Sequence, residues 1–163
     1  MSRSPISTRS TSLDSITSIS DVLATPALLF RVGADVYASK VADAREVIPL
    51  RSMTRVPGAP AFVRGLINMR GTIVTVLDLG VRLDPARSPL EEGSILLVRQ
   101  SGSDRLVGFV VDEVMDVRSL SIDVSDASDG GARSAITLGM ATLDDATVVV
   151  LDLDVLISQV LLS

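Results

Sequence analysis

Short runs of branched apolar residues, separated by polar turns, make up most of the chain from residue 28 onward. β-Branched residues favour strands, and a Gly33-Ala34-Asp35 turn between two such runs predicts a hairpin over residues 28–39. Further strands are expected over residues 72–79, 95–99, 106–111, 114–122, 136–143 and 147–151. The pattern therefore predicts a mainly β protein.

Short helices interrupt this pattern. Alanine and glutamate favour a helix over residues 41–47, which has to end before Pro49. A single helical turn is expected over residues 62–67 and a closing helix over residues 153–161. Residues 84–92 contain two prolines and are expected to form a surface loop.

Parts of the sequence repeat. The segment Val-Leu-Asp-Leu at residues 76–79 recurs at 150–153, and residues 41–47 align with 111–117, at offsets of about 70. Two similar small barrels, each needing the other to bury enough surface, would produce such a repeat. The alternative is a chance similarity between strands rich in valine and leucine.

Residues 1–25 differ in composition from the rest. They contain twelve serines and threonines and are too polar to bury enough surface to offset the entropy of ordering them. We therefore expect a flexible tail over 1–25 and a folded domain over 26–163. We interpret the tail as inert, with a tether or a phosphorylation target as the alternatives.

Composition and charge narrow the functional classes. With 163 residues, 47% of them hydrophobic, the chain is one domain or two very small ones sharing a core. The net charge of −5 divides into +3 over residues 26–103 and −8 over residues 104–163. This asymmetry suits an electrostatically steered protein partner and argues against nucleic acid. No apolar stretch could span a bilayer and no signal-peptide core is present, so a cytoplasmic location without membrane insertion is expected.

The sequence offers little for catalysis or metal binding. Cysteine and histidine are absent, which removes thiol nucleophiles, thiolate ligands and the commonest general base. Asp78 and Asp152 could form a catalytic pair, but at matching strand ends we interpret them as caps of the following helices. The acidic run at 123–130 resembles a calcium loop, yet its spacing is wrong and the terminal glutamate is missing. We expect no enzyme, no cofactor and no metal site.

Charged residues near turns are the remaining candidates for a functional site. Arg64 and Arg70 flank residues 65–69 around a predicted turn. Arg70 either reaches a nearby carboxylate or carbonyl and locks the loop, or contacts a partner. Glu46 either lies at the rim of a groove lined by small residues or is a solvated helix end.

Two segments resemble the CheW family of chemotaxis coupling proteins. Residues 55–79 hold, in register, a Pro-x-x-Pro entry, a Phe-x-x-Gly turn, an Asn-x-Arg-Gly corner and a closing Asp-Leu. Residues 106–114 contain the sequence Val-Gly-x-Val-Val-Asp that is typical of the family. The resemblance covers about residues 28–161. The chain departs from the family pattern at Thr75, where proline is common, and at Met69, where leucine is common.

The resemblance implies a mainly β fold of two intertwined five-stranded SH3-like barrels with short connecting helices and a C-terminal helix. It implies a non-catalytic adaptor that links the cytoplasmic tips of methyl-accepting chemoreceptors to the regulatory domain of a CheA-type histidine kinase, itself CheW-like. Such domains can alternate in rings beneath a receptor array, at the inner face of the membrane.

The resemblance also implies roles for individual residues. It places the receptor tip in the groove between the barrels, at Val41, Ala44, Glu46 and Val111. It ties receptor and kinase coupling to Arg64, Gly65 and Arg70. One alternative is a paralogue that has lost one interface and acts as a spacer or inhibitor in a motility-type pathway. Another is a small barrel that binds a ligand or acts as an enzyme.

Overall fold

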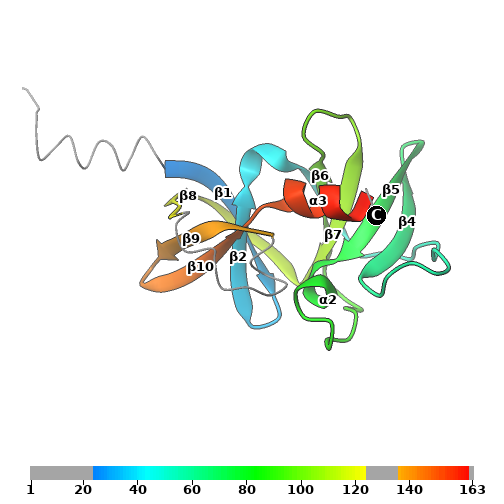
Figure 1. Ribbon diagram of the computed structural model, residues 1–163, viewed down its shortest axis with the longest axis horizontal. Coiled ribbons are helices and arrows are strands. Elements are labelled where there is room, and N and C mark those ends of the chain that lie inside the picture. The colour runs from blue at the N-terminus through cyan, green and yellow to red at the C-terminus, as the bar shows by residue number, and fades with distance from the viewer. Residues whose placement is uncertain (1–23, 124–135, 162–163) are drawn as a thin grey trace, which may run out of the picture.

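The computed structural model describes residues 24–123 and 136–161, which fold mainly as β-strands (Figure 1). In chain order the elements are β1 (Ala24–Val32), β2 (Asp35–Lys40), the 3₁₀ turn η1 (Val41–Asp43), β3 (Ala44–Pro49), β4 (Val63–Met69), β5 (Thr72–Asp78), α2 (Leu79–Leu83), β6 (Ser94–Arg99), β7 (Leu106–Val111), β8 (Glu113–Ser121), β9 (Thr137–Leu143), β10 (Ala146–Leu151) and α3 (Leu153–Leu161). β1 already begins at Ala24, inside the segment expected to be a tail, and the rest of that segment lies outside the described residues. So does most of the acidic run at 123–130.

The strands form two five-stranded sheets, as expected. Sheet A has the strand order β8-β1-β2-β10-β9, and sheet B has the order β3-β6-β7-β5-β4. One pair in each sheet is parallel, β2 with β10 in sheet A and β5 with β7 in sheet B. The other pairs are antiparallel. Figure 1 shows sheet A on the left and sheet B on the right.

The two halves of the chain exchange strands. Sheet A takes β1 and β2 from the first half and β8, β9 and β10 from the second, whereas sheet B takes β3, β4 and β5 from the first half and β6 and β7 from the second. Each sheet closes on itself through a short bridge, Thr54 with Leu66 in sheet B and Asp123 with Met140 in sheet A. The prediction of two intertwined barrels is therefore confirmed.

The repeat in the sequence extends to single backbone atoms. The Asp78 N–H donates to the carbonyl of Phe62 at 2.6 Å, and the Asp152 N–H donates to the carbonyl of Ile136 at 2.7 Å. Ile136 follows Phe62 by the same number of residues as Asp152 follows Asp78. The entry and exit of the β4–β5 hairpin and of the β9–β10 hairpin are therefore built alike. This agreement excludes a chance similarity between apolar strands.

Three apolar clusters hold the sheets together. One cluster lies inside sheet A and another inside sheet B. The third and largest lies between the sheets, with Phe30 and Tyr37 from sheet A, Phe109 from sheet B, and Leu156 and Ile157 from α3. Side chains alternate along each strand, so β1 sends Leu28 and Phe30 to the cluster between the sheets and Ala27 and Leu29 to the sheet A interior. Neither barrel buries its apolar surface alone.

Helices α2 and α3 are short, and an aspartate caps each of them. The Asp78 carboxylate accepts a hydrogen bond from the Val81 N–H at 3.1 Å at the start of α2. The Asp152 carboxylate accepts one from the Val155 N–H at 3.2 Å at the start of α3. The prediction that both aspartates cap helices is confirmed, as are the bounds of the closing helix. In the described part of the chain, no helix is long and apolar enough to cross a membrane.

Two predicted helical segments are wrong. Residues 41–47 form the η1 turn followed by the edge strand β3, in which Glu46 pairs with Leu97 of β6. Residues 62–67 belong largely to β4, which pairs with β5 and carries a bulge between Val63 and Gly65. In both cases pairing with another strand overrides the local helix preference, which is worth only about a few tenths of a kcal/mol per residue.

Candidate functional site

Glu46 and Arg70, both singled out from the sequence, form a bidentate ion pair. The two guanidinium nitrogens Nη1 and Nη2 of Arg70 lie 3.0 and 3.1 Å from the Glu46 carboxylate oxygens. Glu46 is on β3 and Arg70 is in the β4–β5 turn, so the pair joins the two edge strands of sheet B. The hydrogen bond to Glu46, together with its negative charge, raises the pKa of Arg70 above the ordinary arginine value. Arg70 therefore reaches a carboxylate, the first of the two interpretations its position allowed.

The β4–β5 turn holds Arg70 in an unusual backbone conformation. Arg70 has a φ of 53° and Gly71 a φ of 88°. The Asn68 side-chain oxygen accepts a hydrogen bond from the Gly71 N–H at 2.8 Å and closes the turn. Although 77% of the Arg70 side chain is exposed, its position is defined by this turn and by Glu46. The pair is thus an ordered feature of an open surface.

The two edge strands of sheet B meet along a line that we call the seam. Three contacts define it. They are the Glu46–Arg70 pair, a hydrogen bond from Arg51 Nη2 to the Asn68 carbonyl at 2.8 Å, and the Thr54–Leu66 bridge. In that bridge the Thr54 N–H donates to Leu66 at 3.0 Å and the Leu66 N–H donates to Thr54 at 2.8 Å.

Gly65 lies beneath the seam on β4 and can only be glycine. Its φ is 148°, which side-chain-bearing residues rarely adopt. A Cβ at this position would collide with the carbonyl oxygen of Thr54 and lie 3.0 Å from the Cβ of Met53. The resemblance pointed to Gly65 as part of a turn, but the structure places it in a strand. The close approach of the Thr54 backbone makes the glycine necessary.

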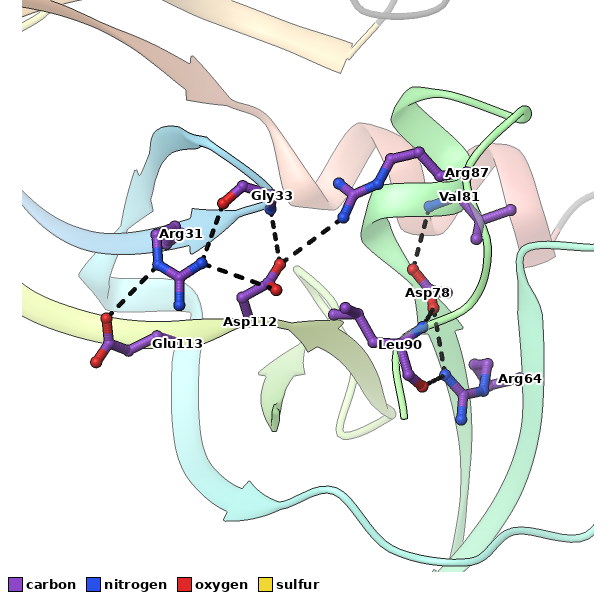
Figure 2. Close-up of polar contacts among 9 residues, drawn as sticks. All are labelled: Arg31, Gly33, Arg64, Asp78, Val81, Arg87, Leu90, Asp112 and Glu113. Atoms are coloured by element: carbon purple, nitrogen blue, oxygen red, sulfur yellow. Dashed lines mark hydrogen bonds and ion pairs between the residues drawn. The ribbon is translucent and has the colours of Figure 1, made fainter. Parts of the chain in front are cut away.

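Arg64 belongs to a buried polar network around Asp78 (Figure 2). Its Nη1 lies 3.3 Å from the Asp78 Oδ2 atom and also donates to the Leu90 carbonyl. The Leu90 N–H donates to the same Asp78 oxygen at 3.1 Å. Asp78 is only 1% exposed, so Arg64 balances a buried carboxylate that also caps α2. Arg64 thereby fixes the loop that precedes β6 against the end of β5.

Val41, Ala44 and Val111 lie where the chain passes from one sheet to the other. The η1 turn, which begins at Val41, leads from sheet A into β3 of sheet B, and Ala44 is the first residue of β3. Val111 ends β7 just before the chain returns to sheet A. Val41 and Ala44 are half-buried, whereas Val111 is 0% exposed and belongs to the cluster between the sheets. The Val111 side chain therefore cannot touch a partner in this conformation.

The structure contains a second polar network, which the sequence analysis did not predict. The Asp112 carboxylate accepts a hydrogen bond from the Gly33 N–H at 2.7 Å and lies 3.8 Å from Arg31 and 4.0 Å from Arg87. Figure 2 shows it between the β1–β2 hairpin of sheet A and the loop after α2. Arg87 can lie there because Gly33 and Gly80 lack a Cβ, which would come within 2.9 Å of its guanidinium. The only feature of the sequence that pointed to this network was the position of Asp112 at the end of the Val-Gly-x-Val-Val-Asp motif.

These observations define a class of protein. Among the described residues, no group of three or more acidic side chains could hold a metal ion. The carboxylates and arginines of the candidate site are paired with one another or with backbone groups. A pair of β-barrels whose paired charges lie on an open seam can bind another protein without large rearrangement.

Comparisons with known proteins identify the family of the chain. The model of the CheW-like domain matches residues 26–161. The chemotaxis protein CheW of Klebsiella aerogenes is 29% identical over 135 residues, which are 81% of this chain and 81% of that protein. The crystal structure of the scaffolding protein TtCheW from Thermoanaerobacter tengcongensis superimposes with a TM-score of 0.69 at 27% identity, covering 78% of this chain and 88% of that one. The chain belongs to the CheW-like domain family.

A further relative has a name other than CheW. Protein PilI of Pseudomonas aeruginosa is 30% identical over 94 residues, 58% of this chain and 52% of that protein. Family membership makes the chain a non-catalytic scaffold protein of the chemotaxis type, so the expectation that it is not an enzyme is confirmed.

Proposed function

We propose that this protein couples the cytoplasmic tips of chemoreceptors to the regulatory domain of a CheA-type histidine kinase. The observation that carries the proposal is the gathering of the candidate residues on one barrel. Ala44, Glu46, Arg64, Gly65 and Arg70 come from β3, β4 and the β4–β5 turn, and all lie on sheet B. Residues that are far apart in the sequence thus lie on the same barrel.

The proposed receptor contact lies on the exposed side of the crossing between the sheets. Val41, Ala44 and Glu46 supply a short apolar strip that ends in an ordered charge. In this proposal Val111 acts only through packing in the cluster between the sheets, because its side chain is fully buried. A preformed surface of this kind binds without large rearrangement, and weak single contacts gain strength when many copies act together in an array.

Arg64, Gly65 and Arg70 are proposed to act in coupling through the shape of the seam. Arg64 anchors the loop before β6, Gly65 admits the Thr54 backbone, and Arg70 holds Glu46. Kinase regulatory domains of this type resemble the chain itself. We therefore propose that the chain and the kinase domain alternate in rings at the inner face of the membrane. The protein would then lie at the membrane through its receptors.

The test is a pair of titrations. The full chain is titrated by calorimetry with the regulatory domain of a CheA-type kinase from the same genome, and separately with a receptor-tip fragment. We expect binding to both partners, each with a Kd of about micromolar size, as is typical of small signalling interfaces. A folded chain that binds neither partner contradicts the proposal.

A second candidate is a paralogue that serves a motility-type pathway and has lost one interface, and the similarity to a relative that is not named CheW supports the existence of paralogues. Such a protein would act as a spacer or inhibitor, because it would occupy one partner without linking it to the other. The same titrations separate the two functions. Binding to only one partner, with the second titration flat at concentrations of about a hundred times the first Kd, would identify the paralogue.

A further inference from the structure

A positively charged hollow of about 360 Å³ lies beside the seam of sheet B. Its walls include Arg51, Arg55 and Arg64, with Met53, Val63 and Pro89 as apolar neighbours. None of the described residues that line it is acidic. On a chain with a net charge of −5, a hollow faced by three arginines is a distinct local feature.

The three guanidinium groups use few of their hydrogen-bond donors within the chain. Arg51 donates to the Asn68 carbonyl, and Arg64 donates to Asp78 and the Leu90 carbonyl. In the part of the chain that the structure describes, Arg55 is exposed and makes no hydrogen bond or ion pair. Three positive charges and the Asp78 carboxylate leave the hollow with a net charge of about +2. Neighbouring like charges repel, so this arrangement favours an added anion.

We propose that the hollow binds a carboxylate side chain from an acidic segment of a partner protein. Each arginine presents a planar fork of donors that matches a carboxylate. The apolar side chains of Met53, Val63 and Pro89 lie beside the arginines and would contact the methylene carbons of aspartate or glutamate. Inorganic phosphate has no such carbons, so the lining favours a protein side chain over a free anion. This inference does not depend on the proposed coupling function.

The absence of a side chain at Gly65 also affects the shape of the hollow. Arg51 and Arg55 flank Thr54, whose carbonyl oxygen is the atom that a Cβ at Gly65 would strike. A larger residue at Gly65 has to push this segment outward and would move both arginines. The glycine therefore sets the geometry of the hollow as well as that of the barrel.

The first experiment uses a hexaglutamate peptide as the probe and the full chain as the receptor. Binding is followed by calorimetry at about 20 mM and about 200 mM salt, because screening weakens contacts between exposed charges. The wild-type chain is expected to bind the peptide at low salt despite its own negative charge. Arg55→Glu is expected to weaken binding by about tenfold or more, and Arg55→Gln by less.

The matched control is Arg99→Glu, which makes the same change of charge on an exposed arginine of β6 outside the hollow. It is expected to leave binding nearly unchanged, and circular dichroism verifies that all variants fold. Equal losses of peptide affinity in Arg55→Glu and Arg99→Glu would overturn the proposal, because the peptide would then be attracted by any exposed arginine and not by the hollow. Inorganic phosphate that binds as tightly as the peptide, with the same dependence on Arg55, would also overturn it in favour of a free anion.

Discussion

Arg70 and Asp144 occupy equivalent turns in the two halves of the chain, with φ angles of 53° and 50°, yet they carry opposite charges. Arg70 pairs with Glu46 on β3 at 3.0 Å, and Asp144 pairs with Arg118 on β8 at 3.9 Å. Both barrels therefore link an edge strand to a hairpin turn through an ion pair, but with reversed polarity. The same backbone therefore presents different charges at the equivalent turns of sheet A and sheet B.

The charge at Glu46 is expected to matter for receptor binding. Glu46→Lys reverses the charge at the seam and should weaken binding of a receptor-tip fragment by about tenfold. The control is Asp116→Lys, an equal change at the equivalent exposed position of β8 in sheet A. Calorimetry measures both variants, and equal affinities would contradict the assignment.

The exchange variant Glu46→Lys with Arg70→Glu separates the surface charge from the ion pair itself. It restores an attractive pair across the seam while both charges stay reversed. We expect thermal stability to return to the wild-type value and receptor affinity to stay low. Recovery of both properties would show that the pair serves only the structure of the turn.

Gly65→Ala is expected to destabilise the fold strongly. The substitution combines an unfavourable φ with a collision against the Thr54 backbone, and should cost about 3 kcal/mol of unfolding free energy. Gly58→Ala is the control, because Gly58 has a φ of 79° but open space around it, and should cost about 1 kcal/mol. Urea denaturation compares the two. Similar losses would mean that backbone strain alone makes Gly65 necessary.

The two helix caps are expected to differ in importance. Asp78→Ala removes a cap, frees the Leu90 N–H and leaves Arg64 without its carboxylate, so it should cost about 3–5 kcal/mol. Asp152→Ala removes a cap from α3 and should cost about 1 kcal/mol. Urea denaturation of both variants measures the difference. Equal costs would contradict the role assigned to the Arg64 network.

Gly80 is expected to be coupled to Arg87. Alanine usually stabilises a helix by about 1 kcal/mol relative to glycine, but a Cβ here would lie 2.9 Å from the Arg87 guanidinium. Gly80→Ala should therefore be more favourable in an Arg87→Ala background, with a coupling of about 0.5–1 kcal/mol in a double-mutant cycle. Additive effects would mean that Arg87 moves aside without cost.

Local sequence signals accounted for much of the fold. Strands such as β5 and β7 are rich in branched apolar residues, and the caps at Asp78 and Asp152 depend on their immediate neighbours. The edge strand β3 was mistaken for a helix because none of its residues is fully buried and its alanine and glutamate favour a helix.

The contacts that build the site depend on long-range pairing. Glu46 and Arg70 are 24 residues apart, and Gly33 and Asp112 are 79 residues apart. Their meeting requires the exchange of strands between the halves of the chain, which no local pattern encodes. A family resemblance identified Glu46, Arg64 and Arg70 as candidates, but only the structure shows which carboxylate each arginine holds.

The most direct test of the account is whether the chain joins its two partners at the same time. A mixture of the full chain, a receptor-tip fragment and the kinase regulatory domain is sedimented at concentrations about tenfold above both Kd values. We expect a complex that contains all three proteins and whose amount falls when Glu46→Lys replaces the wild-type chain. Separate binary complexes, with one partner displacing the other, would contradict it.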